Sequence, residues 1–503
     1  MIGRGVRLSS ICVALVAIAI ASVPAVGHGG DEPAGVVAPT SLRILTFNIE
    51  YGGTVVSLES ILTAVRRADA DVVAFNEVYG KTARLGRLTG YDFVSRRLDL
   101  VSRYPIVDAP GSDGRYAFVQ LAPGHVVAVA NVHLPSSDYG PRRLLDGWSR
   151  IAVLREERSG RLPAVRPFVN AMDGLPEAGI PTFVVGDLNS PSHEDWIEAT
   201  VDLRPQIRFP VAWPVTRFLA RNGFVDAWRV VHPDPATDQG LTWPAGRPRS
   251  DSSWNPRRDA PHDRIDQIWS AGPATAVRSD LVGERHGPGV GISVRPWGSD
   301  HRAVVSTFDV TPGTPPVMVS PAPQLVEVGE AVDVTYHAPG GDGERIRIVP
   351  RAGDPIVDVI DSQGTPPGAA NDGTSTFATG TLAAGPYDVV LIDGAGVELA
   401  RAPFWVREPD APPILDTRWR HGIGEPIEIG FTQAPGNRFD WIGLYARGGD
   451  PLVDYYLEYR YTGAAVEGSV TFDVLLPPGR YTAYYLLTDV YRQVAGVDFV
   501  IKH

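Results

Sequence analysis

The stretch TFVVGDLNS, residues 182–190, joins a short apolar run to a polar turn. The run at residues 183–185 is typical of a buried strand, and it stops at Gly186. Asp187 and Asn189 follow on either side of Leu188, and Gly, Asp, Asn and Ser are residues that turns favour. The stretch is therefore either an ordinary strand end or a turn that directs the side chains of Asp187 and Asn189 toward a common centre.

Strand-like runs of the same kind recur along the chain before residue 310. The segment SLESILTAVRRADA, residues 57–70, is different: it begins at a capping serine and repeats apolar residues at helical spacing. This mixture predicts an α/β domain with a multi-stranded sheet over residues 41–310. The predicted strands are LRILTFNI (42–49), DVVAFN (71–76), HVVAVANVHL (125–134), TFVVGD (182–187), RIDQIW (264–269) and AVVSTFDV (303–310).

Most of these runs end beside side chains that bind metals or carry protons. Taken singly, a glutamate after a strand is ordinarily a solvated loop residue, and a histidine on an apolar strand is ordinarily a hydrogen-bonded core residue. Ligands in open sheets gather beyond the strand ends, so the assembled set predicts one shared site. The set comprises Asn48, Glu77, His133, Asp187, Asn189, Asp263, Asp266, Asp300 and His301.

The chemistry of this set favours a hard divalent cation. Its carboxylates and carboxamides suit Mg²⁺, with Mn²⁺ and Ca²⁺ as alternatives, and the chain has one cysteine, so a cysteine-based metal site is excluded. Asp300 adjoins His301, which sets a metal ligand beside a base, and a further carboxylate, Asp263 or Asp266, is expected to orient the histidine. These residue types predict metal-assisted hydrolysis of a phosphate ester.

The order of these residues resembles the endonuclease/exonuclease/phosphatase superfamily, which includes deoxyribonuclease I, neutral sphingomyelinases and inositol polyphosphate 5-phosphatases. The resemblance covers residues 41–310, and its most specific part is GD-x-N (186–189) followed about a hundred residues later by SDH (299–301). It implies a four-layer α/β sandwich, in which two packed sheets are covered by helices, and the activity of a phosphoric ester hydrolase.

The resemblance also implies how the metal and the histidine are used. Asn48 and Glu77 are expected to bind the metal, with Glu77 as the principal carboxylate. Asp300 is expected to help bind the metal or to polarise His301. His301 is expected to act as a general base or to stabilise the transition state.

The remaining family roles concern the water and the phosphate. Asp187 is expected to position or activate the attacking water, and Asn189 to hold the scissile phosphate. His133 is expected to bind the phosphate and to protonate the leaving oxygen.

Two further assignments remain open from the sequence. The family places an aspartate either before or after Arg-Ile, whereas HDRIDQIW has both Asp263 and Asp266, and Asp266 is slightly favoured as the partner of His301. The segment SRYPI, residues 102–106, also resembles a family segment. Arg103 in it either binds substrate by facing the phosphate or belongs to a plain strand and turn.

The sequence changes character after residue 310. A Pro-rich linker is predicted at 311–320, followed by short strand-like segments with Gly and Pro turns. RIRIVPRAGDPIVDVI (345–360) is echoed by DWIGLYARGGDPLVDYY (440–456). The repeat predicts two all-β, Ig-like sandwich domains at 321–406 and 407–503, for which a cell-surface or glycan ligand is the expected partner.

The N-terminus predicts export. Two arginines precede an apolar run from residue 11 to 23, and small residues follow, so residues 1–27 are predicted to be a signal peptide and 28–40 a flexible lead-in. The protein is therefore expected to be secreted, with no integral membrane span after cleavage, and monomeric. The formal net charge of −12 speaks against a protein that coats polyanions.

The combined prediction is a secreted, divalent-metal-dependent phosphodiesterase in which water attacks phosphorus in line. Its substrate is expected to be a nucleic acid, a phospholipid or a small phosphodiester. The alternative is a secreted binding or adhesion protein whose phosphoesterase-like domain has lost its activity.

Overall fold

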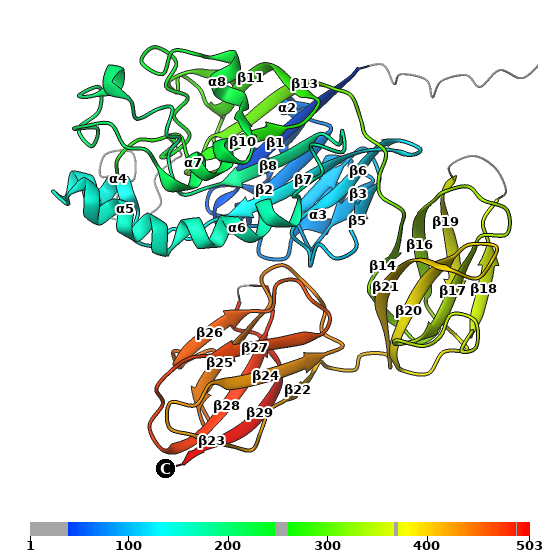
Figure 1. Ribbon diagram of the computed structural model, residues 1–503. Helices are drawn as coiled ribbons and strands as arrows, with labels where there is room; N and C mark the ends of the chain where they lie inside the picture. Colours follow the sequence, from blue (N-terminus) through cyan, green and yellow to red (C-terminus); the bar gives the residue numbers. More distant parts are fainter. Residues whose placement is uncertain (1–38, 247–259, 367–370, 489, 503) are drawn as a thin grey trace, which may run out of the picture. The chain divides into compact units, whose positions relative to one another are not determined.

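The computed structural model describes residues 39–246, 260–366, 371–488 and 490–502 (Figure 1). The predicted signal peptide and lead-in lie outside these residues, apart from the last two positions of the lead-in. The first sheet of the α/β domain has seven strands. In spatial order they are β12 (Val290–Val294), β11 (Ala274–Glu284), β13 (Ala303–Val310), β1 (Thr40–Asn48), β2 (Val72–Asn76), β4 (Leu100–Ser102) and β3 (Phe93–Ser95).

A second, six-stranded sheet completes the β-structure of this domain. Within this sheet, the adjacent strands β7 and β8 run parallel to each other, whereas β10 runs antiparallel to β8. The spatial order is β5 (Ile106–Asp108), β6 (Ala117–Ala122), β7 (His125–His133), β8 (Thr182–Asp187), β10 (Asp266–Ala271) and β9 (Val225–Asp226).

The helices lie between the strands along the chain. They are α1 (Glu50–Gly53), α2 (Leu58–Ala68), α3 (Thr82–Thr89), α4 (Gly140–Leu145), α5 (Arg150–Ser159), α6 (Arg161–Ala171), α7 (Pro214–Arg221) and α8 (Ala227–Val231), with a 3₁₀ turn at Glu198–Thr200.

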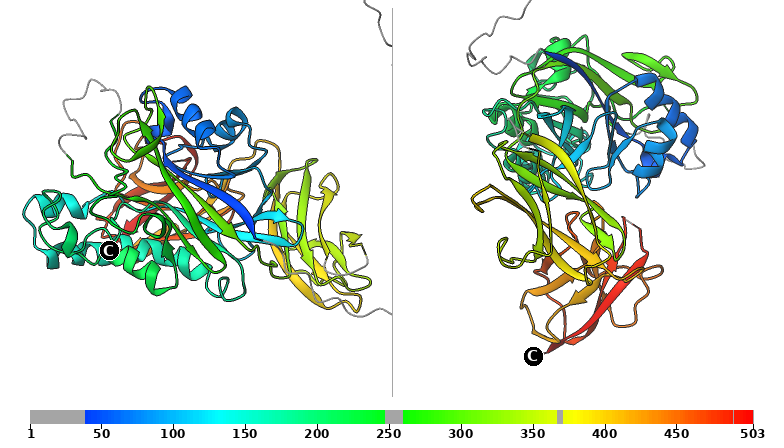
Figure 2. Two further views of the ribbon diagram at one scale, coloured as in Figure 1. Left: turned by 90° about the horizontal axis from the view of Figure 1, so that it is seen from above. Right: turned by 90° about the vertical axis from the view of Figure 1, so that its right-hand side faces the viewer.

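Three apolar layers show that the α/β domain is a four-layer sandwich. Residues such as Ile44 of β1 and Phe183 of β8 pack between the two sheets. On the outer face of the first sheet, Phe47 of β1 packs with Ile61 of α2. On the outer face of the second sheet, α6 and α7 cover the strands (Figure 2). The predicted four-layer architecture is confirmed.

The predicted elements of this domain correspond closely to the observed ones. The helix expected at 57–70 is α2, which follows Ser57 as its N-cap residue and ends where Asp69 adopts a left-handed conformation. All six predicted strands are present as β1, β2, β7, β8, β10 and β13. The strands missed by the sequence analysis, such as β3 and β9, are only two or three residues long or lack a clear alternation.

Two β-sandwiches follow, and each pairs a three-stranded sheet with a five-stranded sheet. In the first sandwich, the three-stranded sheet has the order β14 (Met318–Ala322), β16 (Ala331–Ala338), β19 (Asn371–Ala378). Its five-stranded sheet has the order β15 (Leu325–Glu327), β21 (Glu398–Arg407), β20 (Gly385–Ile392), β17 (Arg345–Pro350), β18 (Asp361–Gly364). In the second sandwich, the three-stranded sheet has the order β22 (Ile414–Asp416), β24 (Ile427–Thr432), β27 (Gly468–Phe472). Its five-stranded sheet has the order β23 (Arg420–Gly422), β29 (Gln493–Lys502), β28 (Gly479–Leu486), β25 (Trp441–Ala446), β26 (Glu458–Tyr461).

The strand orders of the two sandwiches are the same, element for element, which confirms the repeat read from the sequence. Each sandwich has its own apolar core, around Ile346 in the first and Ile442 in the second. The predicted linker at 311–320 is partly structured, since Gly313 pairs with Val126 and Met318 begins β14. Over the described part of the chain, no helix has the length and apolar character needed to cross a membrane.

Candidate active site

Strand ends from both sheets meet at one edge of the α/β domain. In the first sheet β1 and β2 run parallel, with Asn48 opposite Asn76. In the second sheet, His133 of β7 and Asp266 of β10 both pair with Asp187 of β8. The backbone N–H of Asp187 donates to Asn76 Oδ1 at 2.8 Å, so the two sheets are joined at this edge. The register of the strands therefore gathers the predicted side chains.

Gly186 is required for this arrangement. Its φ is +136°, which L side chains rarely adopt, and a Cβ at this position would lie 1.9 Å from the carbonyl oxygen of Val132. The close approach lets β7 and β8 stay paired up to Asp187. The glycine of GD-x-N thus sets where the aspartate lies.

The carboxylate of Asp187 is the centre of the site. Its Oδ2 lies 3.1 Å from Asn48 Nδ2, 3.7 Å from His133 Nε2 and 3.8 Å from His301 Nε2. Its Oδ1 accepts the backbone N–H of Asn189 at 2.8 Å. Burial raises the pKa of Asp187 to about 7. Four predicted site residues from four separate segments therefore converge on one carboxylate.

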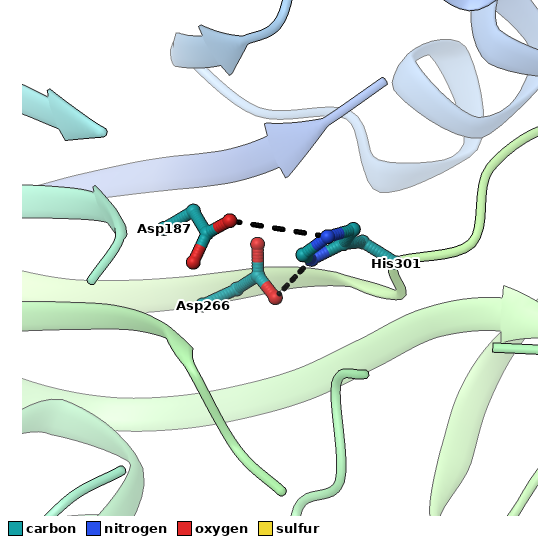
Figure 3. Close-up of side chains that lie close together, drawn as sticks. All are labelled: Asp187, Asp266 and His301. Atoms are coloured by element: carbon teal, nitrogen blue, oxygen red, sulfur yellow. Dashed lines mark hydrogen bonds and ion pairs between the residues drawn. The ribbon is translucent and has the colours of Figure 1, made fainter. Parts of the chain in front are cut away.

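Asp266 fixes the orientation of the His301 imidazole. Its Nδ1 lies 2.9 Å from Asp266 Oδ2, while its Nε2 faces Asp187 (Figure 3). The backbone N–H of His301 donates to Ser299 Oγ at 3.0 Å. Burial lowers the pKa of His301, but the carboxylates of Asp266, Asp300 and Asp187 outweigh it and raise the pKa well above the ordinary value. The imidazole is thus protonated at neutral pH, which suits charge stabilisation better than proton abstraction.

The geometry decides between the two aspartates of HDRIDQIW. Asp266 contacts His301, as the sequence slightly favoured. Asp263 instead accepts hydrogen bonds from Trp196 Nε1 at 3.1 Å and from the Tyr139 hydroxyl at 3.3 Å. The alternative in which Asp263 orients the histidine is therefore corrected: this buried carboxylate holds aromatic side chains in place.

Glu77 lies directly beyond β2 in a left-handed conformation, with φ +57°. Its Oε1 accepts from Asn48 Nδ2 at 3.1 Å, and its Oε2 accepts the backbone N–H of Tyr51 at 3.1 Å. Burial raises the pKa of Glu77, but the charges of His133 and His301 and these hydrogen bonds outweigh it and lower the pKa. Glu77 is therefore an ionised carboxylate at neutral pH, as a metal ligand must be.

Asn48 is oriented as a hydrogen-bond donor. Its amide nitrogen contacts the carboxylates of Glu77 and Asp187, and its Oδ1 accepts the backbone N–H of Glu50 at 3.1 Å. Metal ligation through Oδ1 requires the amide to turn over. The role of Asn48 as a metal ligand stays a prediction.

The remaining donor atoms fit a divalent cation. Asp187 and Asp266 each offer a carboxylate oxygen, and these oxygens lie within 4.8 Å of each other, whereas protonated His301 has no free nitrogen for a cation. Among the described residues, Asp266 Oδ1 is buried without a hydrogen-bond partner, which a cation would satisfy. Asp300 Oδ1 lies 3.9 Å from His301 Nε2, and its Oδ2 accepts from Trp243 Nε1 at 3.2 Å.

His133 and Asn189 offer neutral polar groups beside these charges. Burial lowers the pKa of His133 to about 4, although Glu77 opposes the shift, so its imidazole is neutral at pH 7. Asn189 has φ +46°, and its Nδ2 donates to Leu134 O at 2.9 Å and to Asp187 Oδ2 at 3.3 Å. Both side chains are therefore fixed next to the central carboxylate.

Arg103 is not part of this cluster, which corrects the interpretation that it faces the phosphate. It follows β4, whose Ser102 pairs with Val72 at the start of β2, whereas Glu77 lies past the other end of β2. The guanidinium forms ion pairs with Asp69 and Asp71. This position of Arg103 matches the other interpretation of SRYPI, as the end of a strand and a turn.

Several polar residues at the site received no role from the sequence. Asn76 Nδ2 donates to Asn131 Oδ1 at 3.1 Å, and Asn131 Nδ2 donates to Phe75 O at 2.8 Å, which ties the two sheets together. Asn131 interrupts an apolar strand and Asn76 ends one, and these two positions were the available signal. Tyr139 and Trp243 lie edge to face at 5.5 Å beside Asp300, and nothing in their local sequence indicates this position.

Comparison with known proteins shows the family to which the α/β domain is similar. Residues 45–301, just over half of the 503 residues, match the model of the endonuclease/exonuclease/phosphatase family. A protein of Caenorhabditis elegans, the uncharacterized protein F14F9.5, is 28% identical over 255 residues, which cover 46% of this chain and 79% of that protein.

The solved structures that match this chain are distant in sequence. An endonuclease/exonuclease/phosphatase from Beutenbergia cavernae is 19% identical, with a TM-score of 0.34, covering 73% of this chain and 99% of that one. The inositol polyphosphate 5-phosphatase domain of SpSynaptojanin, in complex with inositol (1,4)-bisphosphate and calcium ion, is 12% identical, with a TM-score of 0.31, covering 54% and 85%. Fibronectin(III)-like modules of Clostridium thermocellum CbhA are 14% identical, with a TM-score of 0.15, covering 37% and 93%. By its match over residues 45–301, this chain belongs to the endonuclease/exonuclease/phosphatase family.

Proposed function

We propose that the protein is a secreted phosphodiesterase that uses a divalent cation, Mg²⁺ by preference, and an in-line attack of water on phosphorus. The observation that carries the proposal is the convergence of side chains on Asp187. Asn48, His133 and His301 all lie within 3.1 to 3.8 Å of its Oδ2, and Asp266 supports His301 from behind. A purely structural cluster would not need one buried and one half-buried histidine among the carboxylates of Asp187, Asp266 and Glu77.

The protein groups divide the reaction between them. Asp187, with a pKa of about 7, positions the attacking water and accepts its proton as the water oxygen bonds to phosphorus. The bond from phosphorus to the leaving oxygen breaks in the same step, and the leaving oxygen takes up a proton from solvent. Protonated His301, fixed by Asp266, stabilises the negative charge that develops on the phosphoryl oxygens. Neutral His133 donates a hydrogen bond to the same phosphate, and Asn189 does so with the amide hydrogen that it otherwise directs at Asp187; together they hold the phosphate in line with the water.

The cation has a matching set of donors. Glu77 would hold it at one side of the cluster, with Asp266 and Asp300 as the further carboxylates. When bound, such an ion supplies Lewis-acid stabilisation of the phosphate oxygens.

Substitution of the central residues tests the proposal. Asp187→Asn and His301→Ala are each expected to lower kcat/KM for bis-p-nitrophenyl phosphate by about 10²- to 10³-fold, because each removes a preorganised group. The matched control is Arg103→Ala, which removes a charged side chain at the opposite end of β2 and should leave kcat/KM unchanged. Near-normal turnover of a folded Asp187→Asn or His301→Ala protein would contradict the proposal.

A substrate panel identifies the ester. Plasmid DNA, RNA, sphingomyelin, inositol phosphates and phosphomonoesters are each assayed with Mg²⁺ and with EDTA. Turnover of one class that EDTA removes and Mg²⁺ restores is the expected result. Inactivity on every substrate, with or without Mg²⁺, would instead support the binding or adhesion protein. Assaying the culture medium separately from the cells of a producing strain tests export in the same experiment.

A further inference from the structure

The two β-sandwiches present the same rigid turn to solvent. In the second sandwich, residues 449–456 read GDPLVDYY, and in the first, residues 353–360 read GDPIVDVI. Asp450 Oδ1 accepts the backbone N–H of Leu452 at 2.9 Å, and Asp454 Oδ2 accepts that of Asp450 at 2.8 Å. Asp354 and Asp358 form the corresponding bonds at 2.7 and 2.8 Å. The turn is therefore fixed by its own side chains in both copies.

The fixed turn displays apolar side chains instead of burying them. In the second sandwich, Leu452 is 77% exposed, Val453 79% and Tyr455 87%. In the first, Ile356 and Val357 are exposed at the same positions. Exposing adjacent aliphatic side chains has a cost in water, so apolar tips that protrude in this way are typical of surfaces that meet a partner.

The second sandwich adds an aromatic cluster behind its tip that the first lacks. Trp441, Tyr445, Tyr456 and Tyr459 stand where the first copy has Arg345, Val349, Ile360 and Gln363. The ring of Trp441 lies 5.7 Å from that of Tyr456, 5.9 Å from that of Tyr459 and 5.6 Å from that of Tyr491. These rings form a cluster separate from the main core of the sandwich.

The charges on the turn itself are acidic, whereas Arg492 adjoins Tyr491. Asp450 and Asp454 flank the tip, and Glu458 follows the tyrosines. The nearby Arg460 is engaged, since its Nη1 lies 2.8 Å from Glu458 and its guanidinium covers the ring of Phe472. Aromatic faces combined with carboxylates attract organic cations, above all quaternary ammonium groups. The same carboxylates repel a surface of anionic lipids.

We propose that the tip and the aromatic cluster of the second sandwich (Leu452, Val453, Tyr455, Tyr456, Tyr459 and Tyr491) dock on a lipid surface of choline headgroups. The aliphatic tip enters the interfacial region, and the tyrosines occupy the headgroup level, where amphipathic aromatic rings are favoured. Their faces and the neighbouring carboxylates select the trimethylammonium group. This inference goes beyond the proposed function, because it concerns binding to a surface and requires no catalysis.

Vesicle sedimentation of the full chain tests the inference. The protein is expected to sediment with phosphatidylcholine vesicles and less with vesicles containing phosphatidylethanolamine or phosphatidylglycerol. Val453→Ser is expected to weaken binding roughly tenfold, because it removes an apolar side chain that the interface buries. The matched Val357→Ser, in the first sandwich, is expected to change binding by less than about twofold, since that copy lacks the aromatic cluster.

A second pair of variants tests the headgroup selection. Tyr456→Leu and Tyr491→Leu retain apolar bulk but remove the aromatic faces, so they should reduce the preference for phosphatidylcholine over phosphatidylethanolamine. His301→Ala should sediment like the wild type, which separates this inference from the fate of the proposed activity. The inference is overturned by absent binding to phosphatidylcholine vesicles, by equal losses from Val453→Ser and Val357→Ser, or by a preference for anionic vesicles. Capture by an insoluble polysaccharide or by immobilised phosphocholine, without vesicle binding, would overturn it too.

Discussion

Asp187 owes its position to a single glycine residue before it. Gly186 permits the close approach of Val132 O, and the register of β7 and β8 then sets Asp187 opposite His133. Burial of the carboxylate is balanced by donors from Asn48 and Asn189. A carboxylate that is buried yet surrounded by donors is held in one orientation, which is what positioning a water molecule requires.

The pair of His301 and Asp266 predicts a pH-dependent stability. The pKa of His301 is raised in the folded protein, so its ion pair with Asp266 stabilises the fold fully below the unfolded value of about 6.5 and is lost as the pH rises through the folded-state pKa. In metal-free protein, Asp266→Asn should therefore lower the free energy of unfolding more near pH 6, below the unfolded pKa of the histidine, than near pH 9, above it. Urea unfolding at both pH values measures the difference. An equal loss at both would show that the histidine is not charged in the fold.

Single residues also show where sequence reasoning stops. Asp187 and His301 were predictable, because each stands in a short motif at a strand end. The choice of Asp266 over Asp263 depends on which carboxylate reaches the imidazole across the fold, and no local spacing encodes that contact. Arg103 lies in a segment that resembles the family, but β4 places it at the start of β2, and the site lies beyond the other end of that strand.

At the scale of elements, a buried ionic network fixes the strand that carries Asp266. Arg264 Nη2 lies 2.9 Å from Asp195 Oδ1 and 2.6 Å from Asp226 Oδ2, and Arg229 Nε also contacts Asp195, at 2.7 Å. All four side chains are buried. The network therefore joins the loop after β8, the start of α8 and the residue two positions before Asp266.

Breaking this network is expected to be costly. Arg264→Met leaves two buried carboxylates with too few cationic partners, so it should lower the free energy of unfolding by about 3–5 kcal/mol. Calorimetry of the full chain measures the change in the transition of the α/β domain. The control is Arg278→Met, which breaks the ion pair of the exposed Arg278 with Asp280 and should shift the transition far less, because solvent screens an exposed pair. Equal effects of the two variants would show that burial does not govern the strength of the pairs.

The elements themselves were well predicted where periodicity was strong. The amphipathic pattern of α2 and the apolar runs of β1, β8 and β13 each specify one face or one buried strand. The division of the strands between two sheets was not available from periodicity, because β2 and β8 are apolar on both faces and either could belong to any layer. That division came from the family resemblance.

At the scale of the whole molecule, the chain has a core for each of its folded parts. The core of the first sandwich contains residues between 319 and 406, and that of the second contains residues between 427 and 501. The internal repeat made this division predictable, since two copies of one pattern near 95 residues apart require two cores of the same design. Ile346 and Ile442 occupy the same position in the two copies, and both are fully buried.

This equivalence allows a matched pair of substitutions. Ile346→Ala and Ile442→Ala should each lower the stability of their own sandwich by about 2–5 kcal/mol, because each leaves a cavity in a closed core. In a domain of this size, each kcal/mol lowers Tm by about 4–8 °C, so each variant should shift its own calorimetric transition by about 10 °C or more. Turnover of a small soluble diester, measured well below these transitions, should stay at the wild-type value, because the catalytic side chains belong to a different core. If turnover were instead lost at the temperature at which either sandwich unfolds, the active conformation of the site would depend on the folded sandwiches.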